Sequence, residues 1–285
     1  MKKRFLSLIT IVLAMVMCVF GLVGCSKDNL KGFDIDLAKA VGEELGIDVE
    51  FKLIDWSMKD AEINAGTIDL IWNGMTITPE RLEQLEISNP YLTNNPVMVV
   101  KTESTITKAT ITSSTKIVAE NGSAGEENAI AAFPNNNIQK AADQITCLTE
   151  VLSGTSDVAV LDSILAGYYI NNDESSFKGK LKIITNSQGQ YDTLSSEEYG
   201  IAAKDGYVGL MAKINDTLAK LYADGTMKDI AEEYGLDQLL ISSSWSNYTN
   251  TFDNLSDTEK ASWNNIENKG KIIIGYTLFA PIAYK

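Results

Sequence analysis

The sequence contains no histidine. Histidine-based catalytic triads, histidine general bases and metal sites with histidine ligands are therefore excluded. Cysteine is almost as scarce, with three residues in a chain of 285. Two of them, Cys18 and Cys25, fall within or at the end of the N-terminal apolar segment. Only Cys147 follows it, so no disulfide can form within the mature fold. We expect Cys147 to be a small buried apolar side chain, and we expect no metal ion and no cofactor.

Positive charge is also in short supply. Lysine and arginine number 24 against 38 aspartates and glutamates, which gives a formal net charge of −14. The first 24 residues hold three of the positive charges and no negative charge, so the rest of the chain carries about −17. Binding to nucleic acid requires clustered lysine and arginine, so we exclude nucleic acid as a partner. The length suffices for one large domain or for two lobes with cores of their own.

The N-terminus has the pattern of a lipoprotein signal peptide. A basic start, residues 1–4, precedes an almost wholly apolar run over residues 5–23. The sequence Leu22-Val23-Gly24-Cys25 resembles a lipobox, where a signal peptidase cuts before a lipid-modified cysteine. A plain secretory signal needs no cysteine there. A retained transmembrane anchor is the other alternative, because the run is just long enough to span a bilayer. We expect residues 1–24 to be a signal peptide and Cys25 to anchor an extracytoplasmic protein to the cell membrane through lipid.

The most informative stretch is residues 68–81, which read Ile-Asp-Leu-Ile-Trp-Asn-Gly-Met-Thr-Ile-Thr-Pro-Glu-Arg. A short apolar strand opens into a polar turn at Asn73 and Gly74, and Thr78 then caps a helix that begins with proline. Arg81 follows one turn into this helix. Its planar guanidinium could bind a carboxylate through two parallel hydrogen bonds. A surface arginine in an ordinary strand-to-helix loop is the alternative.

Helices and strands alternate along the first part of the chain. Apolar residues recur at helical spacing over residues 32–45, residues 49–54 alternate like a strand, and residues 59–65 read as a helix. This order predicts an α/β lobe with a largely parallel sheet. Ligands bind beyond the carboxyl ends of such strands, which is where Trp56 and the turn at Asn73 lie.

A second α/β region follows the first. Residues 96–100 read as a strand that leaves the first lobe, and residues 198–203 as the strand that returns to it. Between them, Ser123 begins a helix whose free N–H groups suit an anion, and simple helix capping is the alternative. Further strands are predicted at residues 116–120, 157–161 and 181–184, and further helices at residues 163–170, 209–222 and 226–234.

Three segments resemble one known family. They are residues 68–81, the sequence Ser88-Asn89-Pro90-Tyr91, and the sequence Gly32-Phe33-Asp34-Ile35-Asp36-Leu37-Ala38. All three are similar to segments of the amino-acid-binding proteins of ABC importers, two-lobed receptors with the type II periplasmic-binding-protein fold. The likeness continues to about Leu240. It implies a monomeric receptor, not an enzyme, that captures a polar amino acid between its lobes and delivers it to an ABC transporter permease. Each lobe is expected to be a mostly parallel sheet flanked by helices.

The resemblance implies a role for each charged residue of the site. Arg81 would bind the carboxylate of the ligand, with help from Thr76 and from the helix start at Ser123. Asp162 would bind the α-ammonium group, and the alternative is an N-cap of the following helix. Glu120, at a strand end beside the cleft, could read the side chain of the ligand or could be a solvated charge at its rim.

Four further residues complete the implied site. Trp56 and Phe279 would enclose the ligand between their rings, and ordinary core packing is the alternative. Asn73 and Gly74 would offer backbone or amide groups to the ammonium group. Two features depart from the family. Ala124 stands where many relatives have a threonine, which removes one hydroxyl contact. The loop before Phe279 is one residue shorter than in well-known binders of basic amino acids, so an acidic residue that would read the side chain of the ligand is missing there.

The last predicted strand is out of order relative to this family. Residues 271–282 read as a strand and the turn after it, and in the family this segment precedes the Gly-Phe-Asp helix. Circular permutation is the simplest interpretation, and a swapped strand and a truncated second copy are the alternatives. We expect a central strand of the first lobe, parallel to residues 49–54. The expected divisions are residues 25–98 and 199–241 for lobe 1, 99–198 for lobe 2, 242–269 for a flexible linker and 270–285 for the permuted strand. A possible helix is expected within the linker, at residues 257–267.

Two other functions fit the same fold. Some dehydratases of the cyclohexadienyl or prephenate type resemble it, and they require a carboxylic acid in the cleft for general acid catalysis. Glu120 is the only candidate for that role, and no base partner is evident in the sequence. An amino-acid sensor domain is the other alternative, although no signalling domain follows in the sequence.

Overall fold

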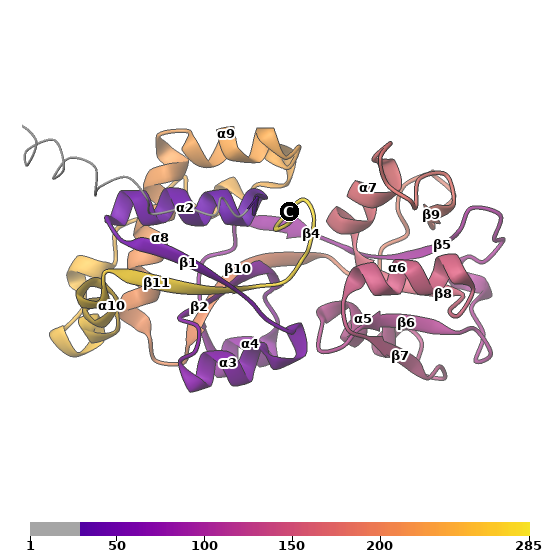
Figure 1. Cartoon of the computed structure of the whole chain (residues 1–285), viewed down its shortest axis with the longest axis horizontal. Coiled ribbons are helices and arrows are strands. Elements are labelled where there is room, and N and C mark those ends of the chain that lie inside the picture. Colours follow the sequence, from indigo (N-terminus) through magenta and orange to yellow (C-terminus); the bar gives the residue numbers. More distant parts are fainter. Residues whose placement is uncertain (1–28) are drawn as a thin grey trace, which may run out of the picture. The chain divides into compact units, whose positions relative to one another are not determined.

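The computed structural model describes residues 29–285. The predicted signal peptide and the predicted lipid modification at Cys25 lie outside this range. Among the described residues, no helix combines the length and the apolar character needed to cross a membrane. Lys31–Lys285 form one unit that contains two β-sheets, each flanked by helices (Figure 1).

The first sheet has the strand order β1-β11-β2-β10-β3, and β4 pairs with β10 beyond this path. Its centre is parallel, because β11 pairs in parallel with both β1 and β2. Strand β10 then runs antiparallel to β2, β3 and β4. The strands are β1 Asp48–Leu53, β2 Leu70–Thr76, β3 Leu85–Ile87, β4 Leu92–Asn94, β10 Glu197–Lys204 and β11 Lys271–Tyr276.

The second sheet has the order β7-β6-β8-β5-β9. Strand β6 is parallel to β7 and β8, whereas β5 is antiparallel to β8 and β9. The chain enters this sheet on β5 and returns to the first sheet on β10. Each of these crossing strands runs against the parallel strands beside it, so each sheet is parallel over three strands only. The strands are β5 Pro96–Lys101, β6 Ile117–Glu120, β7 Ile138–Ala141, β8 Val158–Asp162 and β9 Leu181–Ile183.

Helices cover both faces of each sheet. In the first sheet, α2 and α9 lie on one face and α3 and α4 on the other (Figure 1). The apolar stripe predicted for the first helix is confirmed, because Phe33, Leu37 and Val41 are buried, and Gly46 ends the helix in the left-handed conformation. The helices are α2 Phe33–Leu45, α3 Lys59–Ala65, α4 Pro79–Gln84, α5 Ala124–Ala132, α6 Gln144–Ser153, α7 Ser163–Asn171, α8 Val208–Ala223, α9 Thr226–Glu233 and α10 Asp257–Lys269.

The segment predicted to be a flexible linker is packed against the first sheet. Trp245 and Trp263 are only 4% and 3% exposed. Helix α10 begins with a capping box and lies against α8, where Leu210 N–H donates to the Ser262 hydroxyl at 3.0 Å. A few large apolar side chains therefore anchor a segment that is otherwise polar. The helix predicted at residues 257–267 is confirmed by α10. The prediction of flexibility was wrong because it weighed the composition of the segment and not the spacing of its apolar residues.

Strand β11 occupies the predicted central place. It pairs with β1 over its whole length, from Asp48 opposite Lys271 to Leu53 opposite Tyr276. Ile272 and Ile274 are buried in the core. The prediction of a strand parallel to the first one in the same chain is confirmed.

The turn after β11 supports the start of α2. The backbone N–H groups of Phe33 and Asp34 donate to the carbonyls of Pro281 and Ile282, at 3.0 and 3.1 Å. No side chain caps this helix. The two carbonyls instead accept hydrogen bonds from two of the N–H groups in the first turn that have no partner within the helix. Lys31 and Tyr284 also pair through two backbone hydrogen bonds of 2.8 and 2.7 Å. The two ends of Lys31–Lys285 therefore meet in one junction.

This junction makes glycine necessary at residue 32. Gly32 has a φ of 129°, and a Cβ there would overlap the carbonyl of Ile282. Gly46 also has a positive φ, 67°, but a Cβ there would meet nothing within 4 Å. We expect Gly32→Ala to lower the free energy of unfolding by at least about 2 kcal/mol, because overpacking adds to backbone strain. Gly46→Ala, the matched control, should cost only about 1 kcal/mol. Urea unfolding of both variants measures the difference, and equal losses would contradict this description of the junction.

Candidate functional site

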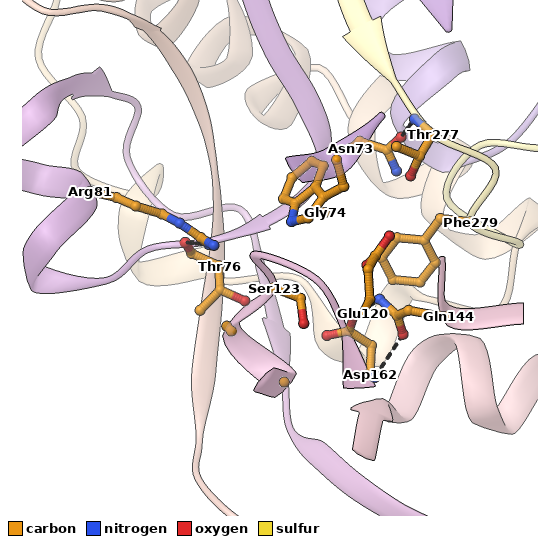
Figure 2. Close-up of a pocket in the computed structure, with 13 residues that line it drawn as sticks. Asn73, Gly74, Thr76, Arg81, Glu120, Ser123, Gln144, Asp162, Thr277 and Phe279 are labelled. Atoms are coloured by element: carbon orange, nitrogen blue, oxygen red, sulfur yellow. Dashed lines mark hydrogen bonds between the residues drawn. The ribbon is translucent and has the colours of Figure 1, made fainter. Parts of the chain in front are cut away.

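A small cavity lies between the two sheets, and Figure 2 shows its lining. All nine residues that the sequence analysis assigned to a ligand site line this one cavity. They are Trp56, Asn73, Gly74, Thr76, Arg81, Glu120, Ser123, Asp162 and Phe279. Ala124, Gly125, Gln144 and Thr277 complete the lining. Among the described residues, no group of three acidic or cysteine side chains is placed to hold a metal ion.

Strand direction explains this convergence. Trp56 and Phe279 lie just beyond the carboxyl ends of β1 and β11, and Asn73, Gly74 and Thr76 belong to the second half of the parallel strand β2. Glu120 and Asp162 are the last residues of β6 and β8 in the second sheet. The carboxyl ends of parallel strands share one edge of a sheet, so each sheet presents its polar residues at the edge that borders the cavity.

Arg81 places a buried positive charge at the cavity. The residue is 7% exposed. Its guanidinium donates to two backbone carbonyls, that of Thr76 at 2.7 Å and that of Gly122 at 3.2 Å. Within residues 29–285 no carboxylate forms an ion pair with it. Burial lowers the pKa of the guanidinium, and the charge of Glu127 opposes this shift. The side chain stays charged at neutral pH and keeps N–H donors free for an anion.

Asp162 is partly buried and is held by neutral donors only. Its carboxylate accepts hydrogen bonds from the amides of Asn94 and Gln144 and, at 2.9 Å, from the hydroxyl of Tyr199. The residue occupies the N-cap position of α7, but its side chain makes no capping bond, so the helix-cap alternative is wrong. Burial raises the pKa of Asp162, and the hydrogen bonds from Gln144 and Tyr199 oppose that rise. The carboxylate is therefore fixed in position without a cationic partner.

Glu120 is also buried, with 5% of its surface exposed, so the alternative of a solvated rim charge is wrong. Burial raises the pKa of this carboxyl to about 8, and the nearby charge of Asp162 contributes to the rise. The side chain of Gln144 and the charge of Lys59 act in the opposite direction. At neutral pH the group is mostly protonated in this environment.

The polar turn predicted at Asn73 and Gly74 is wrong, because strand β2 continues to Thr76, and this part of the strand is tied into the protein at several points. Asn73 accepts the backbone N–H of Thr277 on its side-chain oxygen, and the N–H of Gly74 donates to Asp34 at 2.7 Å. The Thr76 hydroxyl donates to Glu197 at 2.8 Å. These hydrogen bonds hold the second half of β2 in place, and they were not predicted from the sequence. The side-chain nitrogen of Asn73 is buried and has no hydrogen-bond partner among the described residues.

The aromatic residues and Ser123 have partners of their own. Lys59 Nζ lies 5.3 Å from the ring centroid of Trp56, and Phe279 packs edge-on against Tyr199 with 6.4 Å between centroids. The Ser123 hydroxyl accepts the N–H of Glu126 at 3.1 Å, so the capping interpretation of this residue is confirmed. Capping uses an oxygen lone pair and leaves the hydroxyl proton available to a ligand.

Glu197 joins the two halves of the site and was not identified from the sequence. Its carboxylate accepts from Thr76 beside the first sheet and, at 2.8 Å, from Asn128 on α5 beside the second. Burial raises its pKa to about 7, and Asp162 adds to the shift. Asn94 and Gln144, which hold Asp162, were missed as well. No signal in a single sequence connects such polar residues, because they lie far apart along the chain.

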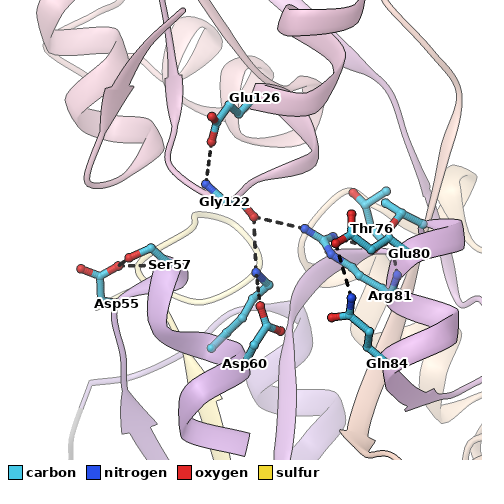
Figure 3. A network of polar contacts seen from close by, with 11 residues as sticks. Asp55, Ser57, Asp60, Thr76, Glu80, Arg81, Gln84, Gly122 and Glu126 are labelled. Atoms are coloured by element: carbon cyan, nitrogen blue, oxygen red, sulfur yellow. Dashed lines mark hydrogen bonds and ion pairs between the residues drawn. The ribbon is translucent and has the colours of Figure 1, made fainter.

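The carbonyl of Gly122 is a second contact between the halves. Lys59 Nζ approaches it to 3.4 Å and the Arg81 guanidinium to 3.2 Å. Figure 3 shows the Arg81 side chain reaching this oxygen from α4, and Lys59 belongs to α3. Two cations from the first half of the site therefore meet the loop that begins α5.

Comparisons with known proteins agree with this architecture. Residues 20–237 match the model of the bacterial extracellular solute-binding proteins, family 3. The chain is 28% identical over 221 residues to the ABC transporter glutamine-binding protein GlnH of Bacillus subtilis, covering 76% of this chain and 77% of that protein.

Two solved structures show the same fold. One is an ABC uptake transporter substrate-binding protein from Streptococcus pneumoniae with bound histidine, at 32% identity and a TM-score of 0.66. The match covers 73% of this chain and 85% of that one. The other is the ancestral amino acid-binding protein AncCDT-1, described as a precursor of cyclohexadienyl dehydratase. It matches at 29% identity and a TM-score of 0.61, over 71% of this chain and 84% of that one.

The family model spans most of the chain, and its range contains eight of the nine predicted site residues, all except Phe279. The solved structures share the two-sheet architecture around the cavity. The chain therefore belongs to the bacterial extracellular solute-binding proteins of family 3.

Proposed function

We propose that this protein captures a polar amino acid in the cavity and delivers it to the permease of an ABC transporter. The observation that carries the proposal is a pair of opposite charges, the buried Arg81 and the partly buried Asp162, neither of which has a charged partner at ion-pair distance in the described part of the chain. Figure 2 shows the two groups well apart along the lining of the cavity. An α-amino acid carries one charge of each sign and would pair with both.

Each group of the ligand has a matching group in the site. The α-carboxylate would accept hydrogen bonds from the free N–H groups of Arg81. The Ser123 hydroxyl and the side-chain nitrogen of Asn73 would be further donors. The α-ammonium group would donate to Asp162, which its three neutral donors hold in place. Charge-assisted hydrogen bonds of this kind are roughly twice as strong as neutral ones. The rings of Trp56 and Phe279 would enclose the rest of the ligand.

The crossing strands suit a hinge. Only β5, β10 and the segments beside them carry the chain between the sheets. Bending there would open the cavity to solvent, and closing would bring the Gly122 carbonyl to Lys59 and Arg81. A closed receptor would be the form that the permease recognises. Lipid modification at Cys25 would keep this receptor close to the permease on the outer face of the cell membrane.

We propose that the fold is circularly permuted relative to its family. The support is that β11 lies in the middle of the first sheet although it comes last in the chain, and that it pairs with strands of its own chain. The junction between Lys31 and Tyr284 would then be the site of the permutation. The chain passes from the first sheet to the second where β5 begins, at Pro96, and returns where β10 begins, at Glu197. Both positions are close to the lobe boundaries expected from the sequence.

A dehydratase is the second candidate function. The specific observation in its favour is Glu120, a buried carboxyl group whose pKa of about 8 would let it act as a general acid at neutral pH. One similar structure carries the description of a dehydratase precursor. Incubation with a prephenate-type acid distinguishes the two functions, because a receptor releases its ligand unchanged and a dehydratase forms product.

The proposal predicts a thermal response to amino acids. A ligand that binds only the folded state stabilises the protein by mass action, and this raises the melting temperature. At a ligand concentration of 100 times the Kd, the free energy of unfolding increases by about 2.7 kcal/mol. We expect one small group of the twenty common amino acids to raise the melting temperature at millimolar concentration. Their decarboxylated amines should have no effect, because they cannot pair with Arg81. A flat response across all twenty would contradict the proposal.

Arg81 should be indispensable for binding. We expect Arg81→Ala to weaken the binding of the highest-affinity amino acid by ~2–5 kcal/mol, because the buried carboxylate of the ligand loses its charged partner. Arg81→Lys, which keeps the charge and loses the planar fork, should fall between Arg81→Ala and the wild type. Calorimetry measures the affinities, and circular dichroism checks that both variants fold. Near-unchanged affinity in Arg81→Ala would show that the carboxylate binds elsewhere.

A further inference from the structure

Glu120 is a buried carboxyl group that lines the cavity and has no cation at ion-pair distance among residues 29–285. The charged and titratable groups around it are Asp162 on β8, Asp143 and Cys147 on α6, and Lys59 on α3. Three of these four groups are acidic or neutral. Lys59 is the only cation of the set. Whether the protein itself pairs Glu120 with a positive charge therefore depends on the contacts that Lys59 makes.

Lys59 is engaged elsewhere. Its Nζ lies 3.2 Å from a carboxylate oxygen of Asp60, 3.4 Å from the carbonyl of Gly122 and 5.3 Å from the ring centroid of Trp56. Three partners therefore surround this ammonium group, and Glu120 is not one of them. The Glu120 carboxyl group therefore lines the cavity without a cation at ion-pair distance among the described residues.

If Glu120 is ionised, the charges along the cavity do not balance for a neutral amino acid. The lining holds one cation, Arg81, and two carboxyl groups, Glu120 and Asp162. The α-carboxylate of a ligand would pair with Arg81, and its α-ammonium group with Asp162. Glu120 would then remain as a buried carboxyl group without a partner, which is costly if it is ionised. One more positive charge, carried by the side chain of the ligand, would balance the site.

We propose that Glu120 is the specificity residue of the cavity and that the ligand is a cationic amino acid, whose side-chain ammonium or guanidinium group pairs with the Glu120 carboxylate. The inference rests on the proposed function, since it names the class of amino acid that the same cavity takes. Gln144 positions both acidic side chains, because its amide donates to Asp162 and lies beside Glu120.

The charge state of Glu120 gives the proposal a second observable. Burial holds the pKa of Glu120 at about 8, so the group carries a proton for most of the time at pH 7. A cation beside it would favour the carboxylate, and the proton would leave as the ligand binds. Affinity for a cationic ligand should therefore rise as the pH increases from 6 to 8 and level off above 8. A neutral side chain that accepts a hydrogen bond from protonated Glu120 would release no proton.

Calorimetry with L-arginine and its uncharged isostere L-citrulline tests the proposal. We expect arginine to bind at least tenfold more tightly than citrulline to the wild type at pH 7. In two buffers of different ionisation enthalpy, arginine binding should release close to one proton per ligand. Glu120→Gln should lower the affinity for arginine by at least tenfold and abolish the proton release. The affinity for citrulline should stay within threefold of the wild-type value. Glu83→Gln removes a charge from an exposed position close to Arg81 in sequence, and it should change none of these values.

Each other result has a definite meaning. If citrulline or glutamine binds as tightly as arginine and no proton is released, the proposal is overturned and Glu120 acts as a neutral hydrogen-bond donor. In that case the protein is still an amino-acid receptor. If no amino acid binds at all, the proposed function fails and the inference fails with it. Loss of arginine binding in Glu83→Gln would show that long-range charge, and not Glu120, sets the preference.

Discussion

The structure depends on the burial of opposite charges that the protein itself does not pair. Arg81 donates to the backbone carbonyls of Thr76 and Gly122, and Asp162 accepts only from amides and a hydroxyl. Neutral groups of this kind fix the position of a charge without neutralising it. A buried charge without a partner is costly, so a cavity lined by such groups favours a ligand that completes the pairs. Recognition of a zwitterion follows from this arrangement, and Glu120 extends it to the side chain of the ligand.

A chain of backbone contacts holds these charges in place. The turn after β11 supplies the carbonyls that accept the first N–H groups of α2. Helix α2 then places Asp34, which accepts the N–H of Gly74 at 2.7 Å and the Tyr91 hydroxyl at 2.8 Å. Gly74 must lack a Cβ, because one would lie 2.8 Å from the ring of Phe279. The last strand of the chain is therefore part of the site as well as of the core.

Much of this was predictable from the sequence, and the parts that were not share a physical cause. Strand ends follow from local apolar patterns, so the residues beyond them could be assigned to one cavity. The partners of Asp162, such as Gln144 and Tyr199, come from distant segments and follow no local pattern. Segment 242–269 was misjudged because two buried tryptophans anchor an otherwise polar sequence. The antiparallel course of β5 and β10 depends on how the chain crosses between sheets, which no short pattern encodes.

The most direct test of the account compares an amino acid with its deaminated analogue in the wild type and in Asp162→Asn. If Asp162 binds the α-ammonium group, the wild type should prefer the amino acid by ~2 kcal/mol or more, and the variant should lose that preference while it binds the analogue as the wild type does. Calorimetry on the four pairs gives the coupling energy. An equal loss of affinity for both ligands would show that Asp162 only supports the structure, and it would contradict the account of the site.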